Sequence, residues 1–231
     1  MTLSNIIDKV DAILYAWHPG TMGGPAIADL LFGLESPSGK LPVTFPRVVG
    51  QIPIYYARKN TGRPPSHESI THIDDIDGKA AQTSLGMSAF YLDAGFTPQF
   101  PFGYGLSYSH FEYSDIAVSA EHAALGDDIE ISATLYNAGG CEAVEVVQLY
   151  VRDLVGNVTR PIRELKGFTR VRLGAGEHRR VSFTLRSEDL AFHNRKMELV
   201  TEAGQFHAWI GGNSDAELWT HFELHDNDAG V

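Results

Sequence analysis

Cysteine is nearly absent from this sequence, since Cys141 is the one cysteine in 231 residues. A single cysteine forms no intrachain disulfide, so a disulfide-stapled scaffold is excluded. Long apolar runs are also absent. None approaches the ~20 residues that a membrane-spanning helix needs, and we expect no membrane partner. The first ten residues lack the basic start and apolar core of a signal peptide, which leaves the localisation open.

Basic residues are scarce, with 18 Lys and Arg against 29 Asp and Glu, for a net charge of −11. A nucleic-acid partner is therefore not expected, because phosphate binding needs concentrated positive charge. We also expect no metal: His67 and His72 lie five apart in a loop, and the acidic run 74–77 lacks the distal glutamate of a calcium loop. The glycine loop 18–24 has neither the P-loop lysine nor the full dinucleotide pattern, and no cofactor is expected.

Residues 1–58 predict part of an α/β layer. The apolar run 12–17 predicts a buried strand, and a turn-rich loop follows it. Pro25 suits a first helical position, and Gly33 suits the end of a short helix. A strand that is apolar on both faces needs cover on both faces. The segment is therefore either a small two-layer domain or, as we favour, the end of an α/β sandwich domain whose other layers belong to a second polypeptide or a removed N-terminal portion.

Residues 59–110 predict a long loop and connector that packs on this layer. Turn-forming residues at 59–67 and an acidic, glycine-punctuated run at 74–79 leave roughly forty residues without a regular pattern. Loops of this length are commonly functional or mobile. The stretch 89–93 predicts a brief ordered piece within it.

Residues 111–226 predict an all-β domain. Short alternating runs separated by turns indicate seven strands of an immunoglobulin-like sandwich. Because the Cys…Trp…Cys signature is missing, fibronectin type III is the better match. The predicted strands are 111–118, 129–135, 144–151, 163–171, 180–185, 204–210 and 218–224.

Several phrases resemble the C-terminal part of family 3 glycoside hydrolases of the β-glucosidase type. The matching phrases, in order, are GGPAIADLLFG at 23–33, PSGKLPVTFPR at 37–47, GQIPIYY at 50–56, NTGRP at 60–64 and FGYGLSY at 102–108. They span about half of the chain, and the remainder resembles the family's last domain, of fibronectin type III type.

The resemblance implies a retaining hydrolase that removes terminal β-linked sugars from an oligosaccharide or β-glucoside. Such enzymes use two carboxyl groups about 5–5.5 Å apart. The family draws its nucleophilic aspartate from a barrel and its acid/base glutamate from upstream of the segment matched here. We therefore expect no catalytic residue in this chain, no activity from it alone, and a barrel-bearing N-terminal portion as its companion chain. A homodimer and, if the missing N-terminus carries a signal peptide, a periplasmic or secreted location are further expectations.

Four residues are candidates for substrate binding. Trp17 and His18 begin the glycine loop, so an indole face and an imidazole are available to a sugar, although core packing of Trp17 and a turn at His18 are the alternative we favour. Arg63 in the NTGRP phrase offers several donors to the hydroxyls or carboxylates of a ligand, and the alternative is that it forms an interdomain ion pair. Tyr91 belongs to a Tyr-x-Asp pair of the family and is either a sugar platform or a loop anchor. The alternative for the whole chain is a non-catalytic carbohydrate-binding or spacer module.

Overall fold

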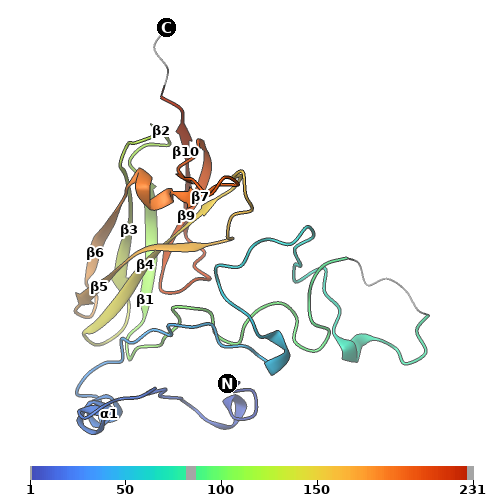
Figure 1. Ribbon diagram of the computed structural model, residues 1–231. Coiled ribbons are helices and arrows are strands. Elements are labelled where there is room, and N and C mark those ends of the chain that lie inside the picture. The colour runs from blue at the N-terminus through green and yellow to red at the C-terminus, as the bar shows by residue number, and fades with distance from the viewer. Residues whose placement is uncertain (1, 82–86, 228–231) are drawn as a thin grey trace.

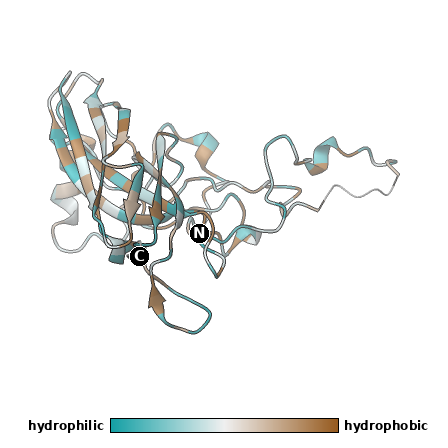
Figure 2. Ribbon diagram, turned by 90° about the horizontal axis from the view of Figure 1, so that it is seen from above, coloured by the Kyte–Doolittle hydropathy of each residue, from teal (hydrophilic) through white to brown (hydrophobic). Residues whose placement is uncertain are grey.

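The computed structural model describes residues 2–81 and 87–227. A β-sandwich occupies one end of the molecule, and the N-terminal segment runs beneath it (Figure 1). Residues around 60–81 and 87–95 extend sideways from the sandwich in both ribbon views (Figures 1 and 2). No helix in the described part of the chain is long and apolar enough to cross a membrane.

The described part of the N-terminal half contains one α-helix and three 3₁₀ turns. Helix α1 is Gly23–Leu31, and the turns are η1 (Ile7–Lys9), η2 (Val49–Gln51) and η3 (Ile73–Asp75). The predicted helix and its end are confirmed, because Gly33 has a φ of 72° and its N–H bonds to the carbonyl of Leu30. Pro25, however, is the third residue of the helix. A proline is tolerated there because the N–H groups of a first helical turn have no intrahelical acceptor.

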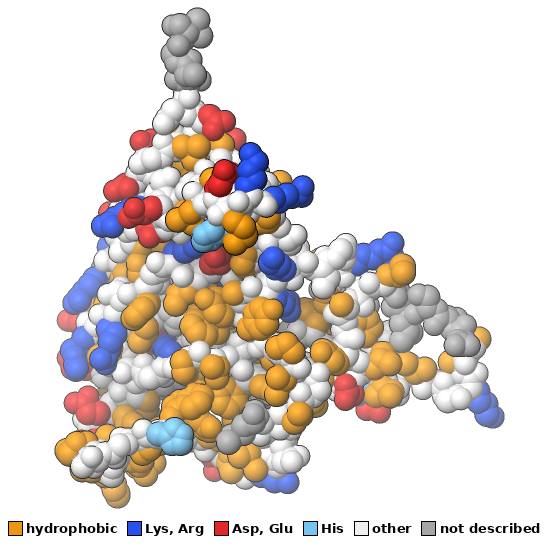
Figure 3. All heavy atoms as spheres, viewed as in Figure 1, with side chains coloured by type: hydrophobic (Ala, Val, Ile, Leu, Met, Phe, Trp, Pro, Cys, Tyr) orange, Lys and Arg blue, Asp and Glu red, His pale blue; other side chains and the backbone are white. Residues whose placement is uncertain are grey.

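The predicted buried strand at 12–17 is wrong. No strand forms there, and Ile13, Leu14 and Trp17 are 39%, 43% and 48% exposed. A strand needs a hydrogen-bonding neighbour, and no strand of the described chain pairs with this run. The apolar sequence therefore lies uncovered on the surface, where Figure 3 shows hydrophobic side chains crowded over the lower half of the molecule.

The sandwich consists of two sheets. One has the order β1-β3-β6 and the other the order β2-β10-β9-β4-β5, with β2 parallel to β10 and the remaining pairs antiparallel. A two-stranded β7-β8 pair and the turn η4 (Ser187–Leu190) lie beside them. The strands are β1 (Phe111–Val118), β2 (His122–Ala124), β3 (Ile129–Asn137), β4 (Ala143–Asp153), β5 (Glu164–Leu173), β6 (His178–Leu185), β7 (Phe192–His193), β8 (Leu199–Val200), β9 (Gly204–Gly211) and β10 (Trp219–His225).

All seven predicted strands are confirmed, as β1, β3, β4, β5, β6, β9 and β10. Their alternating apolar residues meet between the sheets, which is why the pattern predicted them. Ile131 of β3 and Leu149 of β4 are at most 1% exposed, and Phe206 and Phe222 stack with ring centroids 5.0 Å apart. Apolar and polar residues alternate along the strands in Figure 2.

A buried ion pair joins the N-terminal half to the sandwich. Lys40 Nζ lies 2.9 Å and 3.1 Å from the two carboxylate oxygens of Glu145 on β4, and it also donates to the carbonyl of Gly105. The side chains of Lys40 and Glu145 are only 14% and 6% exposed. The hydroxyl of Tyr113 donates to Glu145 at 3.0 Å, and burial, followed by the charge of Glu145, raises the pKa of Tyr113.

Gln148 of β4 makes a second junction. Its amide nitrogen donates to the carbonyl of Gly103 at 3.2 Å and to that of Gly212 at 2.6 Å. Gly103 has a φ of 79°, and a Cβ on this residue would overlap the Gln148 carboxamide. Only glycine combines this backbone conformation with so close an approach. The FGYGLSY phrase is thus a docking loop on the sandwich.

Candidate functional site

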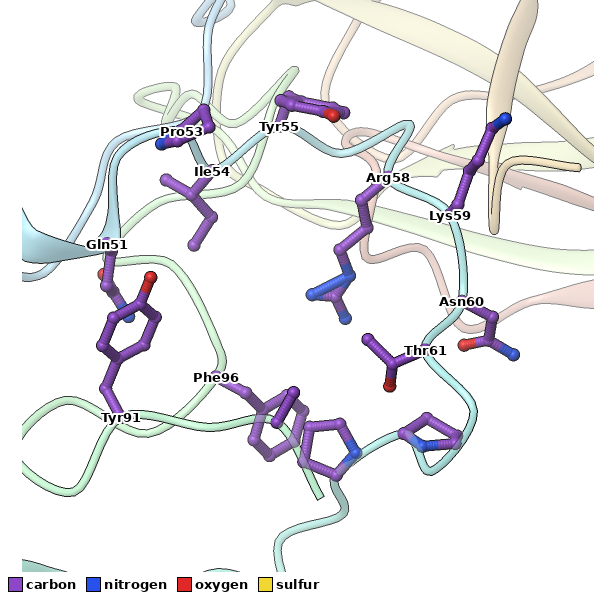
Figure 4. A pocket seen from close by; sticks show the side chains of 13 residues that line it. Gln51, Pro53, Ile54, Tyr55, Arg58, Lys59, Asn60, Thr61, Tyr91 and Phe96 are labelled. Carbon is purple, nitrogen blue, oxygen red and sulfur yellow. The ribbon is translucent and has the colours of Figure 1, made fainter. Parts of the chain in front are cut away.

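Two neighbouring pockets lie in the N-terminal half. The first pocket, here called the Arg58 pocket, has a volume of about 220 Å³ and lies between residues 51–65 and 89–96. Its lining residues are Gln51, Pro53, Ile54, Tyr55, Arg58, Lys59, Asn60, Thr61, Pro64, Pro65, Ala89, Tyr91 and Phe96. Figure 4 shows the Arg58 side chain extending into the space between Ile54, Thr61 and Phe96.

Gln51 fixes one wall of the Arg58 pocket to the long loop. Its side chain is buried, and its Oε1 accepts the backbone N–H of Arg47 at 2.7 Å. Its Nε2 donates to the carbonyls of Thr97 and Ala94 at 3.2 Å and 3.5 Å. The guanidinium of Arg47 also donates to Thr97. A single buried amide therefore sets the position of the segment that carries Phe96.

The opposite wall rests on the sandwich. The carbonyl of Arg58 accepts the N–H of Ile162 at 2.9 Å. Tyr56 stacks on Phe102 at 4.4 Å and meets the edge of Tyr150 at 5.8 Å, while its hydroxyl accepts the N–H of Leu165 at 3.3 Å. These contacts hold the backbone of residues 56–58 against β4 and β5, so Arg58 projects from a fixed base.

The second pocket, of about 240 Å³, is here called the Trp17 pocket. It is lined by Tyr15, Trp17, Val43, Thr44, Phe45, Pro46, Ile52 and Ile54. Trp17 meets Tyr15 edge-on at 4.5 Å and has a φ of 51°, which is rare for a residue with a side chain. Ile54 lines both pockets, so they share one wall.

The chemistry of the pockets suits binding. The side chain of Arg58 has no hydrogen-bond or ion-pair partner among the described residues, which leaves its guanidinium donors available to a ligand. Asn60, Thr61 and Tyr91 add an amide and two hydroxyls, and rings and prolines supply apolar surface. Neither pocket is lined by a carboxylate among the described residues. The pockets thus offer hydrogen bonds and ring faces to a sugar but no acid, base or carboxylate nucleophile.

The candidates from the sequence divide into two pairs. Trp17 lines the Trp17 pocket and Tyr91 lines the Arg58 pocket. His18 and Arg63 are exposed and line neither pocket. Sequence reasoning missed Arg58, although this residue stands only two positions before the NTGRP phrase. Its neighbour Ile162 lies about a hundred residues away in the chain, so no local pattern marked it.

The same region contains no candidate metal centre. Among residues 2–81 and 87–227, no three His, Cys, Asp or Glu side chains come together as ligands for an ion. His72 instead pairs locally with Asp74, at 3.3 Å, at the start of η3.

Two family profiles match the chain. Residues 1–108 match the glycosyl hydrolase family 3 C-terminal domain, and residues 145–214 match a fibronectin type III-like domain. A crystal structure of a β-glucosidase from Listeria innocua in complex with glucose superposes with a TM-score of 0.85 and 36% identity, covering 97% of this chain and 29% of that one.

Curated relatives agree with these profiles. A periplasmic β-glucosidase of Salmonella typhimurium is 40% identical over 216 residues, and a putative β-xylosidase of Formosa agariphila is 40% identical over 224 residues. The matches cover 94% and 97% of this chain but 26% of each relative. The chain therefore spans about a quarter of the length of these relatives. With its C-terminal-domain and fibronectin type III-like segments, the chain belongs to glycoside hydrolase family 3.

Proposed function

We propose that this chain forms the non-catalytic wall of a retaining β-glucosidase-type hydrolase. The observation that carries the proposal is the composition of the two pockets, whose described residues supply ring faces and hydrogen-bond donors but no carboxylate. Retaining hydrolysis needs two carboxyl groups flanking the scissile bond. Both would come from a barrel-bearing N-terminal portion, and this chain alone would be inactive. Removal of a terminal β-linked sugar would take place where that portion meets the Arg58 pocket.

The uncovered apolar surface supports the same proposal. Leu31, Phe32 and Leu34, at and beyond the end of α1, are 65%, 83% and 76% exposed, and Met22 and Val49 are 69% and 68% exposed. Exposed apolar side chains that gather on one side of a protein mark an interaction site, and Figure 3 shows such a gathering over the lower half of the molecule. The companion portion would cover it and would supply the neighbours that the run 12–17 lacks.

Arg58 is the residue through which the wall would contact substrate. A guanidinium presents several donors in a fixed plane, which suits two hydroxyls of one sugar ring. The rings of Tyr91 and Phe96 would then face the apolar side of that sugar. Homodimerisation and a periplasmic or secreted location stay predictions, to be measured by light scattering and by cell fractionation.

A chimera tests the proposal. The segment of the Salmonella relative that matches this chain is replaced by residues 1–231, and hydrolysis of a chromogenic β-glucoside is measured. We expect turnover from the chimera and none from the chain alone. Arg58→Met should lower kcat/KM by roughly tenfold or more, because it removes a charge-assisted hydrogen bond to the substrate. Arg63→Met is the control and should change kcat/KM by less than about twofold. Turnover by the isolated chain, or equal effects of the two variants, would overturn the proposal.

A further inference from the structure

The outer face of the five-stranded sheet carries two parallel rows of side chains. Strand register aligns Tyr150 of β4 with Trp209 of β9 and Trp219 of β10. It likewise aligns Arg152, His207 and His221 in the row next to it. Residues opposite one another in adjacent strands share a face, and so do residues two apart in one strand. These six residues, here called the Trp219 grid, therefore lie on one face of the sheet, where Tyr150 is buried against Tyr56 and the other five are at least partly exposed.

The aromatic row is buried at its Tyr150 end and exposed at its Trp219 end. Trp209 is covered by the guanidinium of Arg163, 4.4 Å from its ring, and Arg163 also donates to the carbonyl of Ser214. Trp219 is 50% exposed. The His207 ring lies 4.7 Å from Trp219 and 5.7 Å from Trp209. The core contacts of the same strands hold this arrangement, so Trp219 presents an ordered indole face to solvent.

The second row supplies polar groups of both kinds. The side chain of Arg152 has no hydrogen-bond or ion-pair partner within the described residues and offers only donors. Partial burial, followed by the charges of Arg152 and His221, lowers the pKa of His207. At neutral pH the His207 imidazole is consequently neutral, with one donor and one acceptor nitrogen. A row that both donates and accepts matches hydroxyl groups, which do the same.

We propose that the Trp219 grid binds a neutral β-linked gluco-oligosaccharide. The two rows are two residues apart along each strand, about 7 Å along the backbone, and neighbouring strands lie about 4.8 Å apart. A pyranose with equatorial hydroxyls has a flat C–H face, which would stack on Trp219, and a hydroxyl rim, which would reach His207, His221 and Arg152.

This site is separate from the two pockets and does not depend on the proposed catalytic role. Tyr150 begins the aromatic row and meets the edge of Tyr56, which immediately follows the pocket residue Tyr55. The grid therefore starts at the base of the Arg58 pocket wall and leads across the sheet away from it. A bound oligosaccharide there would hold a polymeric substrate near the enzyme without contacting the reacting bond.

Binding of cellotetraose to the full chain tests the proposal, measured by titration calorimetry with tryptophan fluorescence as a second signal. We expect a Kd on the order of 0.1–1 mM for the unmodified chain. Trp219→Ala should weaken binding about tenfold or more, and Trp219→Tyr, which keeps a ring, should restore most of it. Phe168→Ala, which removes another exposed ring from the same sandwich, is the matched control and should leave the Kd unchanged.

Thermal unfolding shows whether Trp219→Ala has preserved the fold. If it has not, His221→Ala, at an exposed position of the same grid, gives the second reading, and we expect it to raise the Kd severalfold. No binding by the unmodified chain at about 10 mM ligand, well above the expected Kd, would overturn the proposal. So would a folded Trp219→Ala variant with an unchanged Kd, or equal affinity for the α-linked maltotetraose.

Discussion

Replacing Lys40 by methionine would expose how much the junction between the two halves depends on one buried charge pair. The variant keeps most of the apolar stem but leaves the Glu145 carboxylate, 6% exposed, with Tyr113 as its remaining partner. Removing one member of a buried ion pair typically costs about 3–5 kcal/mol. The Glu145 side chain of the variant can reduce this cost by protonation, however, because a carboxylate that is too costly to bury in its charged form takes up a proton instead.

The free energy of protonating the carboxylate therefore limits the stability lost in the variant, and this limit depends on pH. Protonating a glutamate side chain at pH 7 costs about 3.7 kcal/mol, given an ordinary glutamate pKa of about 4.3 and about 1.36 kcal/mol per pH unit. At pH 5 the same step costs about 1 kcal/mol. Lys40→Met should therefore lower the free energy of unfolding by about 3–4 kcal/mol at pH 7 and by about 1–2 kcal/mol at pH 5. The defect grows as pH rises, because the unfolded state releases the proton that the folded variant retains.

Urea unfolding at the two pH values measures both quantities. The double variant Lys40→Met/Glu145→Gln removes the buried charge and should recover most of the loss at pH 7, in contrast to Lys40→Met alone. A loss below about 1 kcal/mol at pH 7 would refute the reasoning, because a pair this buried would then contribute no more than an exposed one. A loss that is equal at both pH values would show that protonation of the carboxylate is not what limits the cost.

Three further predictions concern stability. Gly103→Ala should lower the free energy of unfolding by at least about 2 kcal/mol, because the added Cβ would overlap Gln148 at a residue with a positive φ. Gly50→Ala, at a position with open space around it, is the control and should change the free energy of unfolding by less than about 1 kcal/mol. Thermal unfolding measures both. Leu149→Ala should cost about 2–5 kcal/mol in urea because it leaves a cavity in the core; a loss under about 1 kcal/mol would contradict the packing. The lowered pKa of His207 means that the unfolded state binds its proton first, so stability falls as pH drops below about 6.5. His207→Asn should therefore lose less melting temperature than the unmodified chain between pH 7.5 and about 5.5, and an identical loss would contradict this.

The sandwich was predictable from the sequence because its information is local. Each long strand alternates apolar and polar residues, and this alternation reports burial on one face directly. The strands β2, β7 and β8 have two or three residues each, too few to show a period. Pairing of β2 with β10 joins segments roughly a hundred residues apart, and nothing in either segment marks its partner.

The N-terminal half was harder, for a different physical reason. The run 12–17 has the composition of a buried strand, but a strand forms only where another strand pairs with it. In the candidate site, Trp17 stood out because it begins the glycine loop, and Tyr91 stood out because it belongs to the Tyr-x-Asp pair of the resembled family. The part played by Arg58 depends instead on how Tyr56 and Ile162 anchor its backbone to the sandwich, and that is a tertiary fact.

Strand β10 has a consequence for how the chain is made. Although it lies close to the last described residue, it sits inside its sheet, between β2 and β9, and it contributes Phe222 and Leu224 to the core. During synthesis the strand edges of β9 and β2 that pair with β10 keep unpaired backbone N–H and C=O groups until residues 219–225 have left the ribosome. The two strands are not neighbours in the sheet, so they do not pair with each other. The five-stranded sheet is completed only then. A nascent chain stopped before Trp219 would therefore contain most of the core residues but could not form the β2-β10 and β10-β9 pairs.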